Sequence, residues 1–314
     1  MSGTRGPQPL REDDPREVAG YTLRARIGEG GMGTVFLTRE RDGRRPVALK
    51  LIRREHAQNE RFRRRFAREV QVARTVQGPH LVPVVDHDAE AELPWLATRY
   101  VPGVPLDEAL REFGPLPVGA ALRLTAGAAH ALAAVHTAGL VHRDVKPANV
   151  LLAAEGPWLM DLGIARDTGN TSALTTVGRM VGTPRYMSPE HALGRDLTSA
   201  SDVFTLGLVA AEAVTGRHPY GEGGGLVVAT RIAGTEHDPP DLGAHPAPLR
   251  ELIAATLAPR PADRPTAAET ASLCDALAAA APARDWLPRP LASAITALAR
   301  ATDPRTFPWL RLRP

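Results

Sequence analysis

The chain has 314 residues, of which 43% are hydrophobic and 23% are charged, enough for one large or two modest domains with a substantial core. The net charge of +3 is small and no basic–aromatic interleaving accompanies it, so we expect no nucleic-acid partner. The single cysteine, Cys274, excludes an internal disulfide and is typical of a reducing compartment. We find neither a signal peptide in residues 1–20 nor an apolar run of about 18 residues that would predict a transmembrane segment, and we expect a cytoplasmic protein.

The use of lysine is strongly biased. Only Lys50 and Lys146 are lysine among the 38 basic residues, and the other 36 are arginine. A compact ammonium and a planar guanidinium are not interchangeable at a tight phosphate site. A lysine that is retained against this bias therefore indicates a position that arginine does not serve.

The N-terminal third predicts strands around a glycine-rich turn. Residues 1–20 predict a flexible arm, and the alternation over residues 21–27 and 46–52 predicts two strands. Between them, residues 28–33 (GEGGMG) lead into a further strand. A dinucleotide fingerprint would require these glycines to open a helix, and a flexible hairpin tip would need no ligand. The order strand, turn, strand favours a flap whose backbone N–H groups approach phosphate oxygens.

A helix and two more strands are expected next. Apolar residues at three- and four-residue spacing predict the helix over residues 60–76, and the strands follow at residues 81–86 and 95–100. Glu69 lies at the edge of the helix's apolar stripe. It pairs either with a surface arginine or with Lys50, and we favour Lys50, which such a pair would orient toward phosphates.

Beyond a predicted linker at residues 100–105, the chain is mainly helical. Helices are expected over residues 106–113, 118–138 and 201–215, with a last one ending near Ala281. A strand-rich lobe therefore precedes a helix-rich lobe, and a cleft at such a junction is a common ligand site. Residues 282–314 predict a mostly flexible Pro- and Arg-rich tail with a short apolar face.

Three polar stretches stand out in the helical half. Residues 142–149 (HRDVKPAN) place an acid, a lysine and an amide between two apolar runs, and residues 161–163 (DLG) follow a short strand. A segment rich in Thr, Gly and Ser ends in residues 182–190 (GTPRYMSPE). With the glycine turn and Lys50, these motifs resemble in order and spacing those of the eukaryotic-type Ser/Thr protein kinases, most closely the bacterial branch. The resemblance covers about residues 21–281.

The resemblance implies an α+β, two-lobed fold. The N-lobe, residues 21–101, would hold a small antiparallel sheet and one helix, and the C-lobe, residues 102–281, would be larger and mainly helical. The implied activity is that of a Ser/Thr protein kinase in cytoplasmic signalling, with ATP and Mg²⁺ as cofactors and Mn²⁺ as an alternative metal. The implied partners are protein substrates with Ser or Thr acceptors and a second copy of the chain in trans-autophosphorylation.

The family pattern gives roles to individual residues. Asp144 resembles the base that accepts the proton of the substrate hydroxyl, and Lys146 would steady the γ-phosphate. Lys50 resembles the lysine that holds the α- and β-phosphates, with Glu69 as its partner. Both lysines of the chain thus fall on positions that the family requires as lysine, which favours an active enzyme.

Further positions correspond to metal and nucleotide contacts. Asn149 and Asp161 resemble the two magnesium ligands. The other nucleotide contacts implied by the resemblance are Ile27, Gly28, Glu29, Gly30, Gly31, Met32, Gly33, Val35, Ala48, Arg99, Val101 and Leu151. Thr98 falls at the position that guards the deep part of the adenine pocket.

The resemblance also implies regulation. Arg143 would contact a phosphate on the activation segment, and Thr175 and Thr176 are the best candidates to carry that phosphate. Thr171 and Ser172 are weaker candidates. Each of these residues has an alternative interpretation as an ordinary polar loop residue. Thr183 would bond Asp144 in the active form.

Three residues are expected to support the scaffold. Glu190 and Arg264 would form a structural ion pair, and Asp202 would brace the catalytic loop. The sequence departs from the pattern at Leu162, in place of the usual Phe, and at Ser188, in place of the usual Ala. Neither change removes a reacting group.

Three rival functions remain. A pseudokinase is disfavoured by the complete motif set, and a small-molecule kinase of the aminoglycoside type usually lacks both the HRD motif and the segment around Pro189 and Glu190. A pure interaction module would leave the clustered motif residues unexplained.

Overall fold

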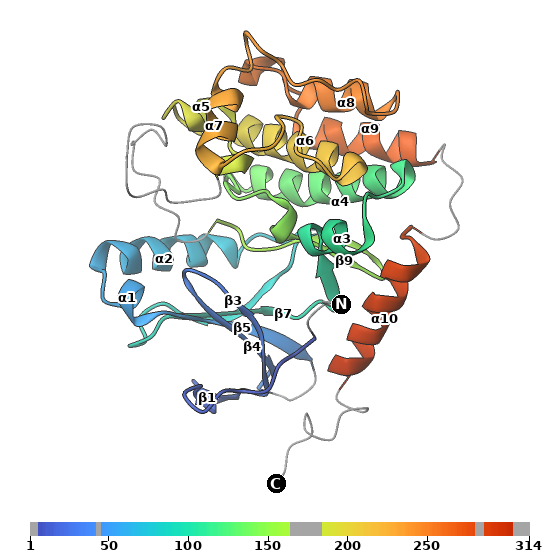
Figure 1. The fold of residues 1–314 in the computed structure, drawn as a ribbon. Coiled ribbons are helices and arrows are strands. Elements are labelled where there is room, and N and C mark those ends of the chain that lie inside the picture. The colour runs from blue at the N-terminus through green and yellow to red at the C-terminus, as the bar shows by residue number, and fades with distance from the viewer. Residues whose placement is uncertain (1–5, 42–44, 164–183, 280–285, 304–314) are drawn as a thin grey trace. The chain divides into compact units, whose positions relative to one another are not determined.

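The computed structural model describes residues 6–41, 45–163, 184–279 and 286–303. The chain divides into two compact units. Unit 1 consists of Met1–Gln77, Val82–Gly103 and Ser293–Pro314, and unit 2 of Gly78–Leu81 and Val104–Ala292. Unit 1 carries most of the strands and unit 2 most of the helices (Figure 1), which confirms the predicted α+β fold class.

Unit 1 is built on a five-stranded antiparallel sheet with the order β3-β4-β5-β7-β6. Its strands are β3 (Ala25–Glu29), β4 (Gly33–Arg39), β5 (Pro46–Ile52), β6 (Val84–Asp88) and β7 (Trp95–Arg99). The short helix α1 (Arg54–Ala57) leads into α2 (Glu60–Ala73), the one long helix predicted for this part. Asn59 begins α2 by accepting a hydrogen bond from the Phe62 N–H, and the apolar stripe of the helix is buried.

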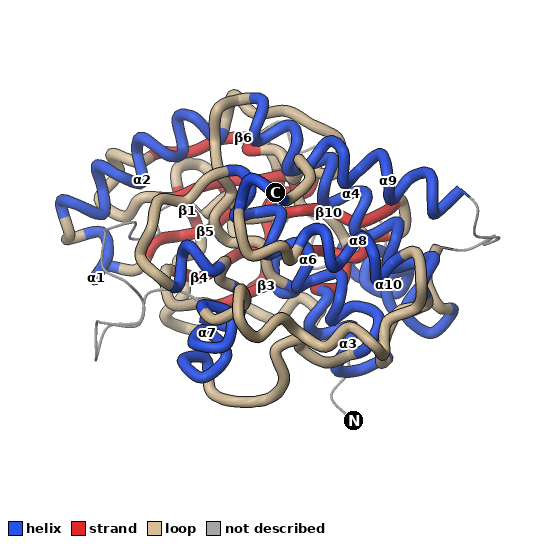
Figure 2. Tube along the Cα trace, turned by 90° about the horizontal axis from the view of Figure 1, so that it is seen from above, coloured by secondary structure: helices blue, strands red, loops and turns tan. Residues whose placement is uncertain are grey.

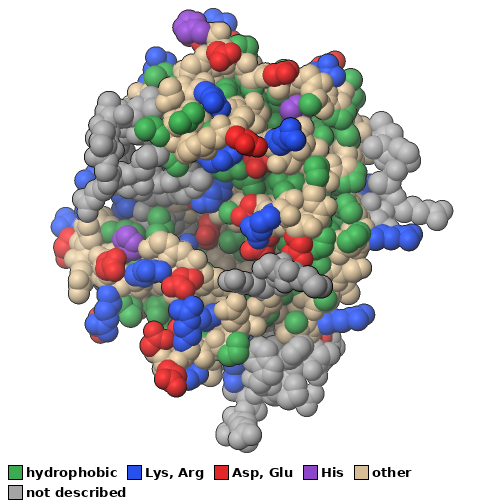
Figure 3. Space-filling model, in the orientation of Figure 1, with side chains coloured by type: hydrophobic (Ala, Val, Ile, Leu, Met, Phe, Trp, Pro, Cys, Tyr) green, Lys and Arg blue, Asp and Glu red, His purple; other side chains and the backbone are tan. Residues whose placement is uncertain are grey.

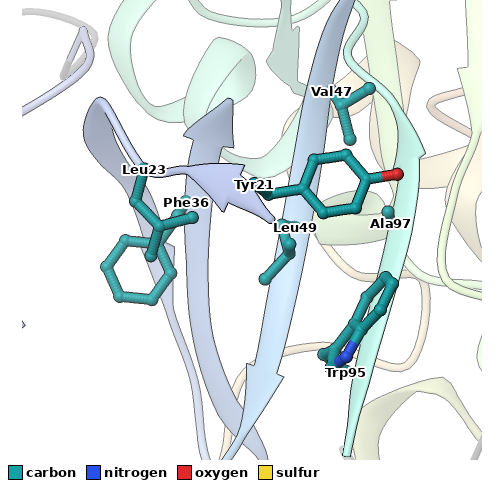
Figure 4. Close-up of a cluster of buried hydrophobic side chains, with 7 residues drawn as sticks. All are labelled: Tyr21, Leu23, Phe36, Val47, Leu49, Trp95 and Ala97. Carbon is teal, nitrogen blue, oxygen red and sulfur yellow. The ribbon is translucent and has the colours of Figure 1, made fainter. Parts of the chain in front are cut away.

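One face of this sheet carries the apolar core of the unit. The core cluster, drawn in Figure 4, consists of Tyr21, Leu23, Phe36, Val47, Leu49, Trp95 and Ala97. Tyr21 and Trp95 meet edge to face, with ring centroids 5.6 Å apart. Because side chains alternate along a strand, Val47 and Leu49 of β5 point into this cluster while Ala48 and Lys50 point to the opposite face.

The structure differs from the predicted flexible arm over residues 6–20. Strand β1 (Glu17–Val18) pairs with β2 (Tyr21–Thr22), and Gln8 forms a backbone bridge with Arg26 at the edge of the sheet. Leu10 and Val18 pack against the core cluster. The physical reason is that the cluster side of the sheet is apolar and is stabilised when this segment removes it from water.

Unit 2 is a helical assembly around α4 (Val118–Thr137), which packs against α6, α9 and β10 (Figure 1 and Figure 2). Its other helices are α3 (Leu106–Phe113), α5 (Pro189–Ala192), α6 (Ser199–Thr215), α7 (Gly225–Ala233), α8 (Leu249–Thr256) and α9 (Ala267–Ala279). By length and composition, α4 is the one helix of the described residues that could cross a membrane. Of its most apolar stretch of 18 residues, 67% is buried within the protein.

Two segments outside the predicted elements have regular structure. Part of the predicted linker is strand β8 (Gly103–Pro105), which joins β9 (Val150–Ala153) and β10 (Gly156–Leu159) in a three-stranded sheet. The tail contains helix α10 (Arg289–Thr302), in which Leu291 and Ile295 are buried, so the expectation of a mostly flexible tail does not hold for these residues. Just before α10, the indole N–H of Trp286 donates to the carbonyls of Ala153 and Ala154.

Candidate active site

The glycine turn of unit 1 is a closed hairpin between β3 and β4. The Gly30 N–H donates to the Gly33 carbonyl at 2.9 Å, and the reverse bond measures 3.3 Å. A Cβ on Gly33 would lie 2.1 Å from the Leu51 carbonyl oxygen, so close pairing with β5 requires glycine there. A Cβ on Gly30 or Gly31 would meet no described atom within 4 Å. The turn's exposed backbone is therefore open to an approaching ligand.

The predicted nucleotide contacts of unit 1 gather on the sheet face opposite the core cluster. In the register of the sheet, Val35 lies opposite Lys50, and Ala48 lies opposite Thr98. The Thr98 hydroxyl is 3.5 Å from the Ala48 carbonyl oxygen. Ile27 packs beside them against Ala25 and Leu37. One face therefore offers apolar side chains together with an ammonium group.

Two further predictions concern unit 1: the adenine contact at Arg99 and the pairing of Lys50 with Glu69. The Arg99 N–H donates to the Pro83 carbonyl at 3.1 Å, so the predicted adenine contact rests on the other backbone groups of Arg99 and on Val101. Lys50 on β5 and Glu69 on α2 are both half-buried within unit 1. Their pairing stays a prediction.

In unit 2, Asp202 holds the backbone of the loop at residues 142–149. Its carboxylate accepts the N–H groups of His142 and Arg143 at 2.7 and 2.8 Å. It also bonds the Nε2 atom of His136 at 2.8 Å. The Asp202 side chain is only 1% exposed. Because the carboxylate satisfies two backbone donors from within the core, it holds Arg143 in a left-handed conformation (φ 65°) that a non-glycine residue rarely adopts.

The reactive groups of the loop are held by their neighbours. The Lys146 ammonium lies 3.1 Å from Oδ2 of Asp144. The Asn149 side-chain amide donates to the Asp144 carbonyl at 2.8 Å, and the Asp144 N–H lies 3.3 Å from Nδ1 of His142. The loop thus presents a carboxylate and an ammonium side by side on a constrained backbone.

The His142 side chain is fully buried beneath this loop. Burial lowers the pKa of its imidazole, although the Asp202 and Asp144 carboxylates oppose that shift. The ring is therefore neutral near pH 7 and its Nδ1 atom accepts the Asp144 N–H. A neutral ring adds no buried charge beside the Asp144 carboxylate.

The DLG segment is bonded onto the same loop. The Gly163 N–H donates to the His142 carbonyl at 3.0 Å, and a Cβ at Gly163 would lie 2.6 Å from that oxygen. The Met160 N–H donates to the Asn149 carbonyl at 3.0 Å. Asp161 lies between these contacts, with a φ of 53°. Asn149 and Asp161, the two predicted metal ligands, are thus fixed to one backbone framework.

These two residues fit a hard divalent cation. The Asn149 amide uses Nδ2 for its internal bond, so Oδ1 is the end that can serve as an oxygen ligand, and Asp161 supplies a carboxylate. The described residues contain no cluster of three or more His, Cys, Asp or Glu side chains suited to a metal. A cation at Asn149 and Asp161 would therefore complete its coordination with water or phosphate oxygens, which suits Mg²⁺.

Glu190 and Arg264 form a buried ion pair within unit 2. Two bonds join them, of 2.7 and 2.9 Å, and the Ser201 hydroxyl also donates to Glu190 at 2.7 Å. The Arg264 guanidinium lies over the Phe204 ring, 4.8 Å from its centroid. Burial alone would raise the pKa of Glu190, but the hydrogen bonds from Arg264 and Ser201 hold it below its usual value. Glu190 is therefore ionised near pH 7.

The regulatory candidates Thr171, Ser172, Thr175, Thr176 and Thr183 lie outside the described residues. Sequence reasoning missed the contact of His136 with Asp202. The only signal was a lone histidine near the end of an apolar helix, and such a histidine has many possible partners.

Comparison with known proteins agrees with this geometry. The family model described as protein kinase domain matches residues 21–273. The probable serine/threonine-protein kinase PkwA of Thermomonospora curvata is 47% identical over 263 residues, covering 83% of this chain and 35% of that protein. The serine/threonine-protein kinase AfsK of Streptomyces coelicolor is 44% identical over 261 residues, covering 83% of this chain and 32% of that protein. The chain thus spans about a third of the length of these relatives.

The fold has solved counterparts. The crystal structure of the Mycobacterium tuberculosis PknI kinase domain matches with a TM-score of 0.64 and 32% identity, over 82% of this chain and 96% of that one. A second crystal structure of that domain has a TM-score of 0.65 at 32% identity and covers 84% of this chain and 97% of that chain. These matches show that the predicted fold is correct.

Proposed function

This chain belongs to the protein kinase family, and we propose that it is a Ser/Thr protein kinase that transfers the γ-phosphate of ATP to protein hydroxyls. The observation that carries the proposal is the Asp144–Lys146 pair at 3.1 Å on a loop whose backbone Asp202 and Asn149 hold in place. Phosphoryl transfer depends mainly on position and charge, and this loop supplies both.

The proposed reaction uses these side chains in separate roles. The substrate hydroxyl oxygen forms a bond to the γ-phosphorus while the bond from that phosphorus to the bridging oxygen of the β-phosphate breaks, and ADP leaves. The Asp144 carboxylate accepts the hydroxyl proton, and the Lys146 ammonium neutralises charge on the transferred group. When bound by Asn149 and Asp161, Mg²⁺ would neutralise the negative charge of the phosphates. Mn²⁺ has the same preference for oxygen ligands.

The proposed nucleotide contacts lie on the sheet face of unit 1 that carries Lys50. Ile27, Val35 and Ala48 would pack on the adenine. The Lys50 ammonium would bind the α- and β-phosphates, with Glu69 orienting it. The glycine turn would place backbone N–H groups against phosphate oxygens.

Specificity for Ser and Thr is supported by Lys146, two residues after Asp144, and by relatives that bear the name serine/threonine-protein kinase. We further propose regulation by autophosphorylation in trans at Thr175 or Thr176, with Arg143 binding the new phosphate. A role in cytoplasmic signalling belongs to the same proposal. Its substrates would be other proteins with accessible Ser or Thr hydroxyls.

The test is autophosphorylation with Mg-ATP, read by mass spectrometry on protein expressed without phosphatase exposure. Wild type should acquire phosphate on Thr175 or Thr176, and Asp144→Asn should lower the rate about 100-fold or more, the usual contribution of a general base. Lys50→Met should lower the rate at least as much. Equal phosphorylation of the same sites in wild type and Asp144→Asn would refute the proposal.

Lys50→Arg tests the argument from lysine usage. It keeps the positive charge but replaces a point charge with a planar fork. We expect most activity to be lost. Turnover equal to that of wild type would show that arginine serves equally well at position 50 and would contradict that argument.

A further inference from the structure

The N-terminal segment, residues 6–20, is joined to strand β3 by a buried ion pair between Asp14 and Arg26. The Asp14 carboxylate lies 3.0 Å from Nε of Arg26, with side chains 4% and 11% exposed. The same carboxylate accepts the Arg11 N–H at 2.7 Å, which closes a turn around it. Buried carboxylates are rare unless they are paired. Asp14 therefore holds the Arg26 side chain in one place.

The backbone of this segment also covers an open sheet edge. β3 is an edge strand of the five-stranded sheet. At Arg26, its N–H donates to the Gln8 carbonyl and its carbonyl accepts the Gln8 N–H, each at 2.8 Å. The β3–β4 register shifts between Arg26 and Gly28, immediately before the glycine turn. Gln8 and Asp14 thus secure β3 at Arg26, the last paired residue before its regular register is interrupted.

From Arg26 the contacts continue into the glycine turn. The Arg26 guanidinium reaches Glu29 at 3.2 Å and the Thr34 hydroxyl at 3.4 Å, so one side chain bridges both strands of the hairpin. Glu29 also accepts from Arg53 at 3.1 Å and lies 3.6 Å from Arg11. On the face shown in Figure 3, acidic and basic side chains alternate in the part where Figure 1 places α1 and β1. The glycine turn is thus connected to the N-terminal segment by charge pairs.

We propose that Asp14 is a positioning residue for nucleotide binding, acting through Arg26 on the glycine turn. The inference rests on the proposed function, because it assumes that this turn covers the phosphates of ATP. Glycine makes the turn mobile, and a mobile turn must be ordered when the nucleotide binds. The Asp14–Arg26 pair restricts that motion in advance, which lowers the cost of ordering the turn.

The effect should be on affinity rather than on the chemical step. Asp14 lies in unit 1, whereas Asp144 and Lys146 lie in unit 2. Asp14→Asn leaves the Arg26 guanidinium without the carboxylate that lies 3.0 Å from its Nε atom, and only part of that loss reaches the turn. We therefore expect Asp14→Asn to weaken Mg-ATP binding about 3- to 10-fold, with kcat within about twofold of wild type.

The experiment measures the Mg-ATP dissociation constant by calorimetry, together with KM, kcat and Tm. The matched control is Asp13→Asn, which makes the same charge change at the adjacent, exposed residue and should leave the dissociation constant unchanged. Gln8→Pro removes the backbone donor to the Arg26 carbonyl at an exposed position and should weaken binding in the same direction. This second variant keeps the test informative if Asp14→Asn does not fold.

The outcomes are distinct. Weaker binding by Asp14→Asn and Gln8→Pro, but not by Asp13→Asn, would support the inference. A lowered Tm with unchanged nucleotide affinity would overturn it, because Asp14 would then serve stability alone. Binding is measured without phosphate transfer, so a wild type that binds ATP but transfers nothing would contradict the proposed function and leave this inference intact. A wild type that does not bind ATP would overturn both.

Discussion

Arg264 and Glu190 are joined by two hydrogen bonds, from Nη1 to Oε1 at 2.7 Å and from Nη2 to Oε2 at 2.9 Å, across 74 residues of chain. Replacing Arg264 with methionine leaves the Glu190 carboxylate buried without its cation. We expect the free energy of unfolding to fall by about 3–5 kcal/mol, measured by urea denaturation. The control is Arg260→Met, whose pair with Asp263 is exposed (74% and 44%) and contributes about 1 kcal/mol or less. If the two variants lost the same free energy of unfolding, the buried Arg264–Glu190 pair would contribute no more than the exposed one, which would contradict this prediction.

Asp202→Asn should impair catalysis without abolishing nucleotide binding. The substitution removes one of the two oxygens that accept the His142 and Arg143 N–H groups, and an unsatisfied buried donor costs about 1–3 kcal/mol. We expect kcat to fall at least about tenfold, because the Asp144 loop loses its fixed position. Steady-state kinetics together with Mg-ATP calorimetry would separate the two effects.

The matched control for Asp202 is Asp275→Asn. Asp275 also contacts a histidine, His130 Nε2 at 2.8 Å, but this pair is exposed and Asp275 is distant from the loop in sequence. It should leave kcat unchanged. A kcat for Asp202→Asn equal to that of Asp275→Asn would show that the loop does not depend on this carboxylate.

Gly33→Ala should destabilise unit 1, whereas Gly31→Ala should not. A Cβ on Gly33 would meet the Leu51 carbonyl oxygen at 2.1 Å, a backbone atom that cannot move without shifting β5. Forcing such an atom into a packed region costs about 1–3 kcal/mol. A Cβ on Gly31 meets nothing described within 4 Å, so its Tm should stay within about 2 °C of wild type. Thermal unfolding of the two variants tests this, and a normal Tm for Gly33→Ala would be incompatible with the β4–β5 register.

His218 predicts a loss of stability at acidic pH. Burial lowers the pKa of its imidazole to about 4, and its Nδ1 atom accepts the Tyr220 N–H. In the unfolded chain the pKa is about 6.5, so between these values the unfolded state binds a proton that the folded state does not. This contribution is fully present above pH 6.5 and is lost as pH falls toward 4, by about 3 kcal/mol at most.

Urea denaturation at several pH values measures the slope of the free energy of unfolding against pH. His218→Gln removes the titrating group while keeping a side chain that can donate to the Arg185 carbonyl, as His218 Nε2 does at 2.8 Å. The variant should show a less steep loss of stability below pH 6.5. His237→Gln, at an exposed position, should keep the wild-type slope. If all three proteins had the same slope, His218 would not be the group responsible.

Much of the site follows from local sequence patterns. The alternation in β5 puts Ala48 and Lys50 on one face, opposite Val47 and Leu49, and the structure has this arrangement. The loop at residues 142–149 has its chemical groups close in sequence, so their proximity needs little tertiary information. The bounds of α3 agree with the predicted residues 106–113.

Other features were not predictable from such patterns. Residues 6–20 are charged and rich in turn-forming types, and the sequence does not show that Asp14 would meet Arg26 rather than water. Helix α10 has a short apolar face, and only the structure shows that Leu291 and Ile295 are buried. The pairing of Lys50 with Glu69 and the phosphorylation of Thr175 or Thr176 stay predictions.

The sequence by itself determined the order of elements, the glycine turn, and the identity of the groups that would act on a phosphate, because these depend on side-chain type and on spacing over a few residues. The tertiary structure decided which distant groups meet: His136 with Asp202, 66 residues apart, and Gln8 with the edge of β3 at Arg26. Such contacts depend on strand register and helix packing. A shift of one residue in the strand register or in the helix packing would give these side chains different partners, although the local composition would be unchanged.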